Sequence, residues 1–386
     1  MSQSFRIRPN GIFQPPCLKT KNLAKEKTMT EEKQTELYKK LPGALIPWYR
    51  ENARDLPWRK DREPYHIWLS EIMLQQTRVE AVKNYYLRFL DRLPKIEDLA
   101  GCDEAELLKL WEGLGYYNRA RNLQKSAKII TFENNGVFPS EYSEILRLPG
   151  IGEYTAGAIA SNCFDEPVAA VDGNVLRVIS RITEMYDDIL KPATKKYVKA
   201  QLESVYPKRD CGDFTQSLME LGAIVCVPSG PPKCSLCPAE SFCLAHKHGT
   251  EVQLPVKEKK KPRRIEERTV FLLSCEGRIA VRKREPSGLL AGMWEFPNIL
   301  GKRSPSEAAA VAASWGCSVA QLEKETFRKH IFSHVEWHMS CFYFRCNGIS
   351  PDFYWPEKRE LHGKIALPTA FRQFLADDSE HYLNNA

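Results

Sequence analysis

The chain has 386 residues, of which 43% are hydrophobic and 27% charged, and its formal net charge is +7. This length favours two or more domains, and the composition is that of an ordinary globular protein. No apolar run approaches the ~18 residues that a membrane span requires, so we expect no membrane partner, and the mildly basic charge is compatible with a polyanionic partner without requiring one.

The first 28 residues are polar and basic, with Glu26 as their only acid. They lack the apolar segment of a secretory signal, so we expect residues 1–29 to be a disordered N-terminal extension, either a transit peptide or sequence ahead of a start at Met29. Eight of the twelve cysteines are scattered along the chain, which favours reduced thiols in a reducing compartment.

Helical patterning runs from about residue 30 to residue 245. The stretch HIWLSEIMLQQ (66–76) is apolar on most faces, as in a buried helix. The spacing of Thr77-Arg78-Val79-Glu80 is that of a capping box and predicts a new helix to about Leu93. Gln75 and Gln76 therefore lie at a helix junction, where their side chains can point outward.

Glycines separate two later pairs of predicted helices, at Gly113–Gly115 and within 144–163. In the second pair, Gly150 and Gly152 allow a positive φ or a close backbone approach. The amide groups that begin the following helix are then available to hold a phosphate oxygen, which makes these glycines candidate phosphate contacts. A tight helical hairpin without a ligand is the alternative.

Two carboxyl groups have contrasting predicted environments. Asp172 follows the apolar run Val168–Val171 and precedes a helix, so it is expected to cap that helix and to stay ionised there. Glu71 has apolar neighbours that favour its protonated form, although it could also be a solvent-facing residue of an amphipathic helix. One neutral and one charged carboxyl is the division of roles that cleavage of a glycosidic or N-glycosidic bond requires.

Four cysteines lie within 18 residues, with seven, two and five residues between them. Four thiolates this close can bind a tetrahedral zinc ion or an iron–sulfur cluster, and the spacing alone does not choose between them. These candidate metal ligands are Cys226, Cys234, Cys237 and Cys243.

The composition changes after a charged, proline-bearing segment at 255–268, which we interpret as a linker. Beyond it, RTVFLLSC, RIAVRKRE and SCFYFRC have strand character. The stretch SPSEAAAVAASWG predicts one helix capped by Ser304 or Ser306. Residues 269–386 are therefore expected to form a smaller α+β domain.

Together, four stretches resemble the helix-hairpin-helix DNA glycosylase superfamily, and most closely its adenine DNA glycosylase family, whose members remove adenine mispaired with 8-oxoguanine. They are LPWRKDREPYHIWLSEIMLQQTRV, LPGIGEYTAGAIA, AVDGNVLRVISR and the four-cysteine run. The resemblance covers residues from about 36 to 376. It implies an all-α glycosylase core over 30–254 with a 4Fe–4S cluster, followed by a Nudix-like 8-oxoguanine recognition domain over 269–386, although the first cysteine gap is one residue longer than the usual six.

The resemblance also implies residue roles. Glu71 would protonate the extruded adenine, Asp172 would stabilise the oxocarbenium-like sugar, and Tyr154 and Asn174 would position these groups. Bifunctional relatives carry a lysine where this chain has Tyr154, so a monofunctional enzyme is expected. The remaining expected contacts are the adenine pocket of Arg54, Trp58, Arg59, Leu74 and Glu220, the duplex wedges Gln76 and Tyr116, and the 8-oxoguanine loop of Phe332, Ser333 and His334.

The resemblance implies double-stranded DNA with adenine opposite 8-oxoguanine or guanine as the partner of a monomer, and the compact loops and short linker favour a bacterial cytoplasmic enzyme. Alternatives are another glycosylase of the superfamily, acting on oxidised pyrimidines or T/G mismatches, and a non-catalytic DNA-binding iron–sulfur protein. A Nudix phosphohydrolase is disfavoured, because the stretch after Pro297 has Glu307 in place of a glutamate-rich magnesium box. For Trp58, Leu74 and Tyr116, packing in the core is the alternative role.

Overall fold

The computed structural model describes residues 31–258 and 262–375. The predicted extension over 1–29 and the end of the second predicted domain (376–386) lie outside the described residues. Within the described ranges, none of the helices combines the length and apolar character needed to cross a bilayer.

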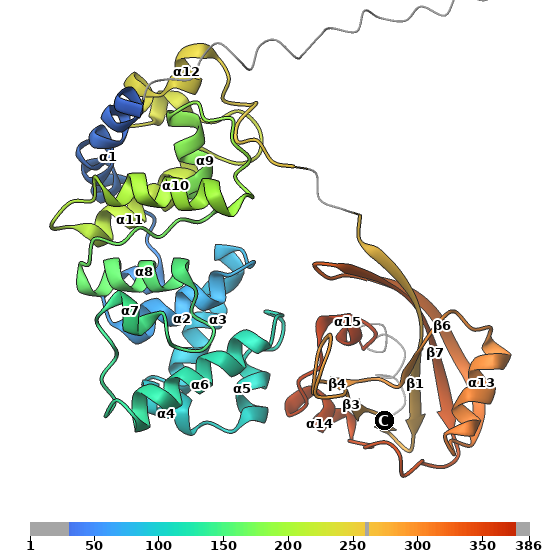
Figure 1. Cartoon of the computed structure of the whole chain (residues 1–386). Helices are drawn as coiled ribbons and strands as arrows, with labels where there is room; N and C mark the ends of the chain where they lie inside the picture. The colour runs from blue at the N-terminus through green and yellow to red at the C-terminus, as the bar shows by residue number, and fades with distance from the viewer. Residues whose placement is uncertain (1–30, 259–261, 376–386) are drawn as a thin grey trace, which may run out of the picture.

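An all-helical domain precedes a β-rich domain, as expected (Figure 1). The helical elements are α1 (Glu31–Asn52), η1 (Pro57–Arg59), α2 (Pro64–Leu74), α3 (Val79–Arg92), α4 (Ile96–Gly101), α5 (Glu104–Leu110), α6 (Asn118–Phe132), α7 (Tyr142–Ile145), α8 (Glu153–Phe164), α9 (Gly173–Ile182), α10 (Pro192–Glu203), α11 (Cys211–Glu220), the π-helical η2 (Leu221–Val225), η3 (Cys234–Leu236), η4 (Glu240–Phe242) and α12 (Leu244–His248). The second domain contains β1 (Arg264–Cys275), β2 (Arg278–Ile279), β3 (Arg282–Lys283), β4 (Trp294–Glu295), β5 (Asn298–Leu300), α13 (Pro305–Ser314), β6 (Val319–Ile331), β7 (Val335–Cys346), α14 (Lys358–Gly363) and α15 (Thr369–Arg372).

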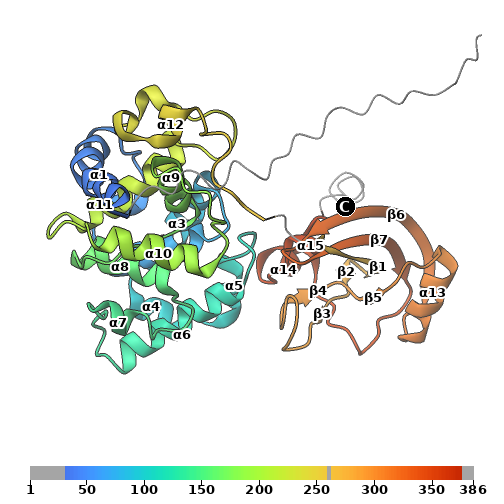
Figure 2. The same cartoon turned by 45° about the horizontal axis from the view of Figure 1, so that its top comes forward.

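The helical domain has two lobes with separate hydrophobic cores (Figure 2). One core is built from α2–α8 and contains the fully buried Trp68 and Trp111. The other is built from α1 and α9–α12 around residues such as Phe214. Since the chain leaves the second lobe after α1 and returns to it before α9, the segments that cross between the lobes bring distant residues to their boundary.

Helix α2 is buried, as its sequence predicts: the residues from Ile67 to Met73 are all inaccessible, including Glu71. Helix α3 begins within the predicted segment, but the expected capping box does not form. The N-cap is Arg78, without a side-chain cap, and the Thr77 hydroxyl instead donates to the Gln75 carbonyl at 3.4 Å. The polar turn after α2 is therefore closed by local backbone contacts.

The two glycines of the α7–α8 hairpin, Gly150 and Gly152, have different structural roles. Gly150 has a φ of +79°, and a Cβ there would lie 2.6 Å from the Asn122 Cβ, so both backbone conformation and space require glycine. Gly152 is the N-cap of α8 with an extended φ of −102°, and the space around it is open. The first amides of α8 have no side-chain cap, which leaves them available for a phosphate oxygen.

The second domain is a mixed sheet of strand order β2-β1-β7-β6, in which β1 runs parallel to β7 and β5 pairs with β1. Hydrophobic clusters cover both of its faces. Ser304 caps α13 in a capping box with Glu307, which confirms one of the two predicted caps. The α+β architecture is thus as predicted.

The predicted linker is too long at its C-terminal end, because β1 already begins at Arg264 and pairs with Val335 of β7. Its charged residues form a strand because they are paired: Glu266 accepts from Arg264, from Arg268 and from the Trp337 indole. The high density of charged residues predicted a solvated linker. In the structure, Glu266 pairs with Arg264 and Arg268 on the same strand, and this pairing allows a charged segment to join the sheet. The connection between the domains therefore ends at residue 263.

Candidate active site

A cavity of about 340 Å³ lies between the two lobes of the helical domain. Its wall contains the nine residues expected to act on or bind the adenine and one of the two expected wedges, Gln76, brought together from α2, α8, α9, α11 and the segments around η1. They are Arg54, Trp58, Arg59, Glu71, Leu74, Gln76, Tyr154, Asp172, Asn174 and Glu220. We name this space the inter-lobe cavity.

Glu71 is 5% exposed on α2 and faces the inter-lobe cavity. Burial raises the pKa of its carboxyl from 4.5 to about 7, and the nearby Asp172 adds to the rise. A hydrogen bond of 2.8 Å from the Tyr154 hydroxyl to Glu71 Oε2 opposes it without reversing it. A carboxyl in this environment can hold a proton near neutral pH and donate it, which makes Glu71 a candidate general acid.

Asp172 caps α9, as predicted. Its Oδ1 accepts from the backbone amides of Asn174 and Val175 at 2.9 and 2.8 Å, and its Oδ2 accepts from the Asn174 side chain at 2.8 Å. These bonds favour the carboxylate, but burial outweighs them and raises the pKa of Asp172 from 3.8. The sequence suggested only the stabilising effect of the helix terminus, because it could not show how far the cavity wall excludes water.

Asn174 is held in turn by Arg177, three residues later on α9. Its Oδ1 accepts from Arg177 Nη2 at 2.8 Å, and Arg177 also donates to the carbonyls of Gly222 and Cys226. These bonds fix the amide so that its Nδ2 points at Asp172. Asn174 is therefore placed where it can orient the Asp172 carboxylate, and its expected role stays a prediction.

Glu220 is completely buried at the cavity wall and forms ion pairs with two arginines. Arg54 Nε and Nη2 donate to its two oxygens at 2.7 and 2.8 Å, and Arg59 Nη2 donates at 2.8 Å. Burial opposes ionisation, but these hydrogen bonds outweigh it and lower the pKa of Glu220 to about 2. The result is a fixed polar part of the cavity wall. Trp58 lines the same cavity and packs edge-on against Tyr86, so it serves both the core and the cavity.

A second cavity, of about 680 Å³, lies between the helical domain and the β-rich domain. Tyr116 and the loop of Phe332, Ser333 and His334 line it, and so does Gly150. The Tyr116 hydroxyl and Ser333 Oγ are 2.7 Å apart across the domain boundary. We name this space the interdomain cavity; the structure thus separates the expected 8-oxoguanine contacts from the expected adenine contacts.

The two expected wedge residues share an uncommon backbone conformation. Gln76 has a φ of +57° and Tyr116 a φ of +48°, the left-handed region that side chains other than glycine rarely adopt. Both residues are exposed, and the Tyr116 side chain is 48% accessible. Strain of this kind is kept where the surrounding structure imposes it and is frequent at functional sites, which favours a contact role for Tyr116 over core packing.

Arg119 is a residue of the site that the sequence analysis did not identify. Its Nη1 donates to the carbonyls of Ile72, Met73 and Gln75, and its Nη2 donates to those of Leu114 and Gly115. One guanidinium therefore ties the end of α2 to the turn that carries Tyr116. No motif around Arg119 indicates this, because its partners are backbone carbonyls from distant segments.

Replacing Arg119 with alanine is expected to lower the free energy of unfolding of the helical domain by about 3 kcal/mol, because several partly buried carbonyls lose a charged donor. The measurement is the midpoint of thermal unfolding, and the control is Arg88→Ala on the exposed surface of α3. Equal midpoints for the two variants would contradict the bridging role of Arg119.

The four cysteines line a small cavity of about 20 Å³ beside α9 and α12. Arg181 Nη1 lies 3.2 Å from Cys226 Sγ, and the Cys243 thiol donates to the Arg181 carbonyl. Burial raises the pKa of Cys237 to about 12 and that of Cys243 to about 11, so these thiols stay protonated unless a metal displaces the proton. All four cysteines line this one cavity, which makes it the candidate metal or cluster site. Gly230, in the longer first gap, has a φ of +75° and open space around it.

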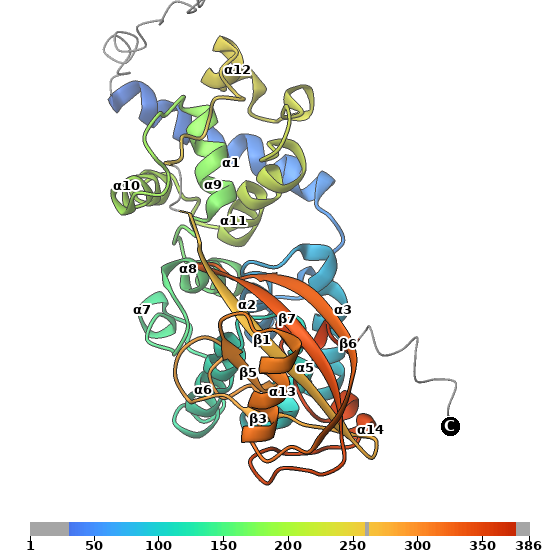
Figure 3. The same cartoon turned by 90° about the vertical axis from the view of Figure 1, so that its right-hand side faces the viewer.

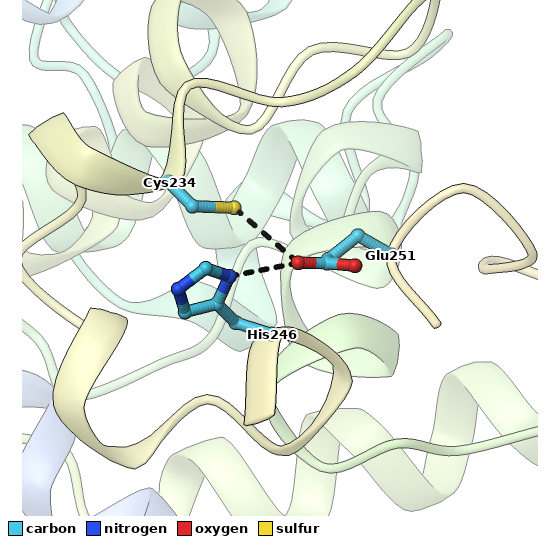
Figure 4. Close-up of side chains that lie close together, drawn as sticks. All are labelled: Cys234, His246 and Glu251. Atoms are coloured by element: carbon cyan, nitrogen blue, oxygen red, sulfur yellow. Dashed lines mark hydrogen bonds and ion pairs between the residues drawn. The ribbon is translucent and has the colours of Figure 1, made fainter. Parts of the chain in front are cut away.

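One of these cysteines also belongs to a mixed donor group (Figure 4). Glu251 Oε1 lies between the Cys234 thiol at 3.8 Å and His246 Nδ1 at 2.8 Å. The three donor atoms lie within 4.8 Å of one another. This hydrogen-bonded group occupies one edge of the four-cysteine cavity and accounts for the orientation of Cys234.

Comparison with protein families gives two matches. Residues 69–208 match the HhH-GPD superfamily of base excision DNA repair proteins, and residues 269–377 match the NUDIX domain. The expected fold class, a helix-hairpin-helix core followed by a Nudix-like region, is therefore confirmed.

Curated relatives match across both domains. The chain is 38% identical over 352 residues to an adenine DNA glycosylase of Arabidopsis thaliana, covering 77% of this chain and 55% of that protein. The chain thus spans about half the length of this plant relative. It is 32% identical over 402 residues to the adenine DNA glycosylase of Rattus norvegicus, covering 86% of this chain and 77% of the relative.

Solved structures match the helical part. A thermostable thymine-DNA glycosylase covers 56% of this chain and 98% of its own, at 30% identity and a TM-score of 0.49. A trapped endonuclease III–DNA covalent intermediate covers 55% and 98%, at 24% identity and a TM-score of 0.46.

Proposed function

Since the chain belongs to the adenine DNA glycosylase family, we propose that it hydrolyses the N-glycosidic bond of adenine opposite 8-oxoguanine or guanine in double-stranded DNA. The observation that carries the proposal is the pair of carboxyl groups in the inter-lobe cavity. Glu71 is buried with a pKa of about 7, whereas both oxygens of Asp172 accept hydrogen bonds at the start of α9. One acid able to donate a proton beside one acid arranged as an anion is what N-glycosidic cleavage needs.

The reaction begins when the adenine leaves the base stack and enters the inter-lobe cavity. Glu71 donates its proton to the base, at N7, and the bond between the base nitrogen and the sugar C1′ breaks with both electrons going to adenine. Asp172 stabilises the positive charge that develops on the sugar. Water then adds its oxygen to C1′ and gives its proton to the Glu71 carboxylate, which restores the acid and leaves neutral adenine and an abasic site.

Tyr154 determines that the product is an abasic site without strand cleavage. A phenol cannot form a Schiff base with the sugar aldehyde, and the nearest polar partner of its hydroxyl is the Glu71 carboxyl at 2.8 Å. We propose that Tyr154 orients Glu71 and that the enzyme is monofunctional.

Borohydride trapping tests this assignment. Incubation of the chain with substrate duplex and borohydride is expected to give no covalent protein–DNA adduct above the level seen with undamaged duplex, while adenine is released. Denaturing gel electrophoresis separates the adduct. Adduct that accumulates in step with adenine release would contradict the role given to Tyr154.

We propose that the four cysteines hold a 4Fe–4S cluster, a proposal supported by the cavity that all four residues line. When bound, the cluster would tie the 226–237 loop to α9 and α12, as a structural element. Arg181, whose guanidinium contacts Cys226 Sγ and the Val227 carbonyl, would hold the loop in place.

Removal of one ligand gives a direct test. Cys237→Ser is expected to abolish the visible absorbance of the cluster, to reduce bound iron and to lower the unfolding midpoint. Iron and zinc are quantified in the purified protein by elemental analysis, and Cys163→Ser, outside the cysteine cavity, is the control. If the wild type contained stoichiometric zinc and no iron, the proposed cluster would be wrong and the four cysteines would form a zinc site.

A single-turnover assay separates the proposed function from its alternatives. Four duplexes carry adenine opposite 8-oxoguanine, adenine opposite guanine, thymine opposite guanine, and thymine glycol. Adenine release from the first two is expected. Activity confined to the last two would identify another glycosylase of the superfamily, and binding without release from any of the four would identify a non-catalytic DNA-binding protein.

Hydrolysis by the Nudix-like domain is not part of the proposal. In α13, the acid at the predicted box position, Glu307, accepts from the Ser304 amide and hydroxyl as a helix cap, so it is not available for magnesium.

We further propose that the enzyme acts as a monomer in a bacterial cytoplasm. The inter-lobe cavity is complete within one chain. No disulfide joins any of the described cysteines, which suits a reducing compartment. Light scattering of the purified chain tests the first point.

A further inference from the structure

The Nudix-like domain lies next to α5 in Figure 1 and in front of the α2–α8 lobe in Figure 3, and hydrogen bonds join it to α5 and α6. Met293 and Ala366 of the Nudix-like domain are 1% and 5% exposed and belong to the core cluster of the α2–α8 lobe. Arg121 of α6 donates to the Ala291 carbonyl at 3.1 Å. Polar contacts such as this one add directional restraint to the apolar contacts at the domain boundary.

Glu112 makes the most concentrated of these polar contacts. Its Oε1 accepts from the backbone amide of Leu367 at 2.9 Å, and its Oε2 lies 3.5 Å from the guanidinium of Arg372. Lys109 Nζ donates to the same Oε2 at 2.8 Å and to the Ile365 carbonyl at 3.2 Å. With 11% of its side chain exposed, Glu112 joins both domains through one largely buried carboxylate.

The segment that carries Glu112 also carries Tyr116, four residues later, and it has little freedom to move. Tyr85 donates its hydroxyl to the Glu112 carbonyl at 2.9 Å. Gly113 has a φ of +100°, and a Cβ there would lie 2.1 Å from the Tyr85 hydroxyl oxygen. A shift of the Nudix-like domain relative to Glu112 is therefore also a shift relative to Tyr116.

We propose that Glu112 is a positioning residue for recognition of the base opposite adenine: it docks the Nudix-like domain so that the loop of Phe332, Ser333 and His334 faces Tyr116 across the interdomain cavity. The 2.7 Å contact between Tyr116 and Ser333 is the visible result of this docking. The inference rests on the proposed function. Glu71 and Asp172 line the other cavity, so docking should affect selection of the opposite base more than bond cleavage.

The test compares Glu112→Ala and Glu112→Gln with the wild type. Single-turnover rates are measured on adenine opposite 8-oxoguanine and on adenine opposite guanine, at limiting and at saturating enzyme. We expect Glu112→Ala to reduce the preference for 8-oxoguanine roughly tenfold, the effect of losing one charged hydrogen-bonding partner, with the saturating rate opposite guanine unchanged. Glu112→Gln keeps an acceptor for Leu367 and should lose less.

Glu106→Ala is the matched control, because Glu106 lies on α5, just before the turn that carries Glu112, and pairs with Arg92 away from the domain boundary. Small-angle X-ray scattering of the DNA-free chain supplies a readout that does not depend on activity: the radius of gyration should increase for Glu112→Ala and not for Glu106→Ala. An unchanged radius of gyration or an unchanged 8-oxoguanine preference in Glu112→Ala would overturn the proposal. A wild type that releases no adenine from either duplex would refute the proposed function, while the scattering comparison would still decide whether Glu112 docks the domain.

Discussion

Glu71→Gln is expected to reduce adenine release by roughly 10²–10⁴-fold, the contribution of a positioned general acid. Glutamine keeps the shape of the side chain and can still accept from the Tyr154 hydroxyl, but it has no proton to donate to the base. Duplex binding should be unchanged. Single-turnover excision and filter binding on the same duplex measure the two effects separately.

The control for this variant is Glu80→Gln, a 78% exposed glutamate in the first turn of α3, which should release adenine at the wild-type rate. Turnover by Glu71→Gln close to that of Glu80→Gln would remove Glu71 from the mechanism.

The same substitution should stabilise the fold at alkaline pH. Because the pKa of Glu71 rises from 4.5 to about 7 on folding, the folded state holds this proton more tightly than the unfolded state. The free energy of unfolding therefore falls by about 3 kcal/mol in total as the pH rises from 4.5 to about 7. Above that range it stays at the lower value. Glutamine removes this loss, so Glu71→Gln should be more stable than the wild type at about pH 8 and equally stable at about pH 4.

Asp172→Asn is expected to slow adenine release by roughly 10²–10³-fold, the usual effect of removing one electrostatic stabiliser of a transition state. Asparagine caps helices about as well as aspartate, so α9 should stay intact and the loss should come from the missing negative charge. Single-turnover excision gives the rate, and the unfolding midpoint gives the state of the helix.

Asp103→Asn provides the matched control, since Asp103 caps α5 by accepting from the Ala105 amide and lies outside the inter-lobe cavity. The two variants should have similar unfolding midpoints, and only Asp172→Asn should lose activity. If both variants lost activity in proportion to their loss of stability, Asp172 would have only a structural role as a helix cap.

Features that depend on neighbouring residues could be predicted from the sequence. The apolar surroundings of Glu71 within α2, the turn at Gly150 and the N-cap at Asp172 are each encoded within a few positions. The Ser304 cap of α13 is of the same kind. The Thr77 capping box was wrong, because the Thr77 hydroxyl bonds to the Gln75 carbonyl instead of an amide of α3.

Features that depend on the tertiary fold could not be predicted from the pattern alone. The resemblance to the glycosylase family predicted which residues form the adenine pocket. The packing of the two lobes, which buries Glu220 and pairs it with Arg54 and Arg59, could be seen only in the structure. The roles of Arg119 and Glu112 could not be predicted from the sequence, because each side chain binds backbone groups that are far away along the chain. Burial of Asp172 is also a tertiary effect, and it moves the pKa opposite to the direction that the helix terminus suggests.

Everything proposed for the chemistry depends on two acids in one cavity that differ in protonation. Infrared difference spectra between the wild type and Glu71→Gln, and between the wild type and Asp172→Asn, report each carboxyl separately as the folded protein is titrated. We expect the protonated carboxyl band of Glu71 to disappear with a midpoint of about 7. At the pH where Glu71 still holds its proton, Asp172 should already give a carboxylate band. Equal midpoints for the two groups, or a midpoint for Glu71 close to that of an exposed glutamate, would contradict the account.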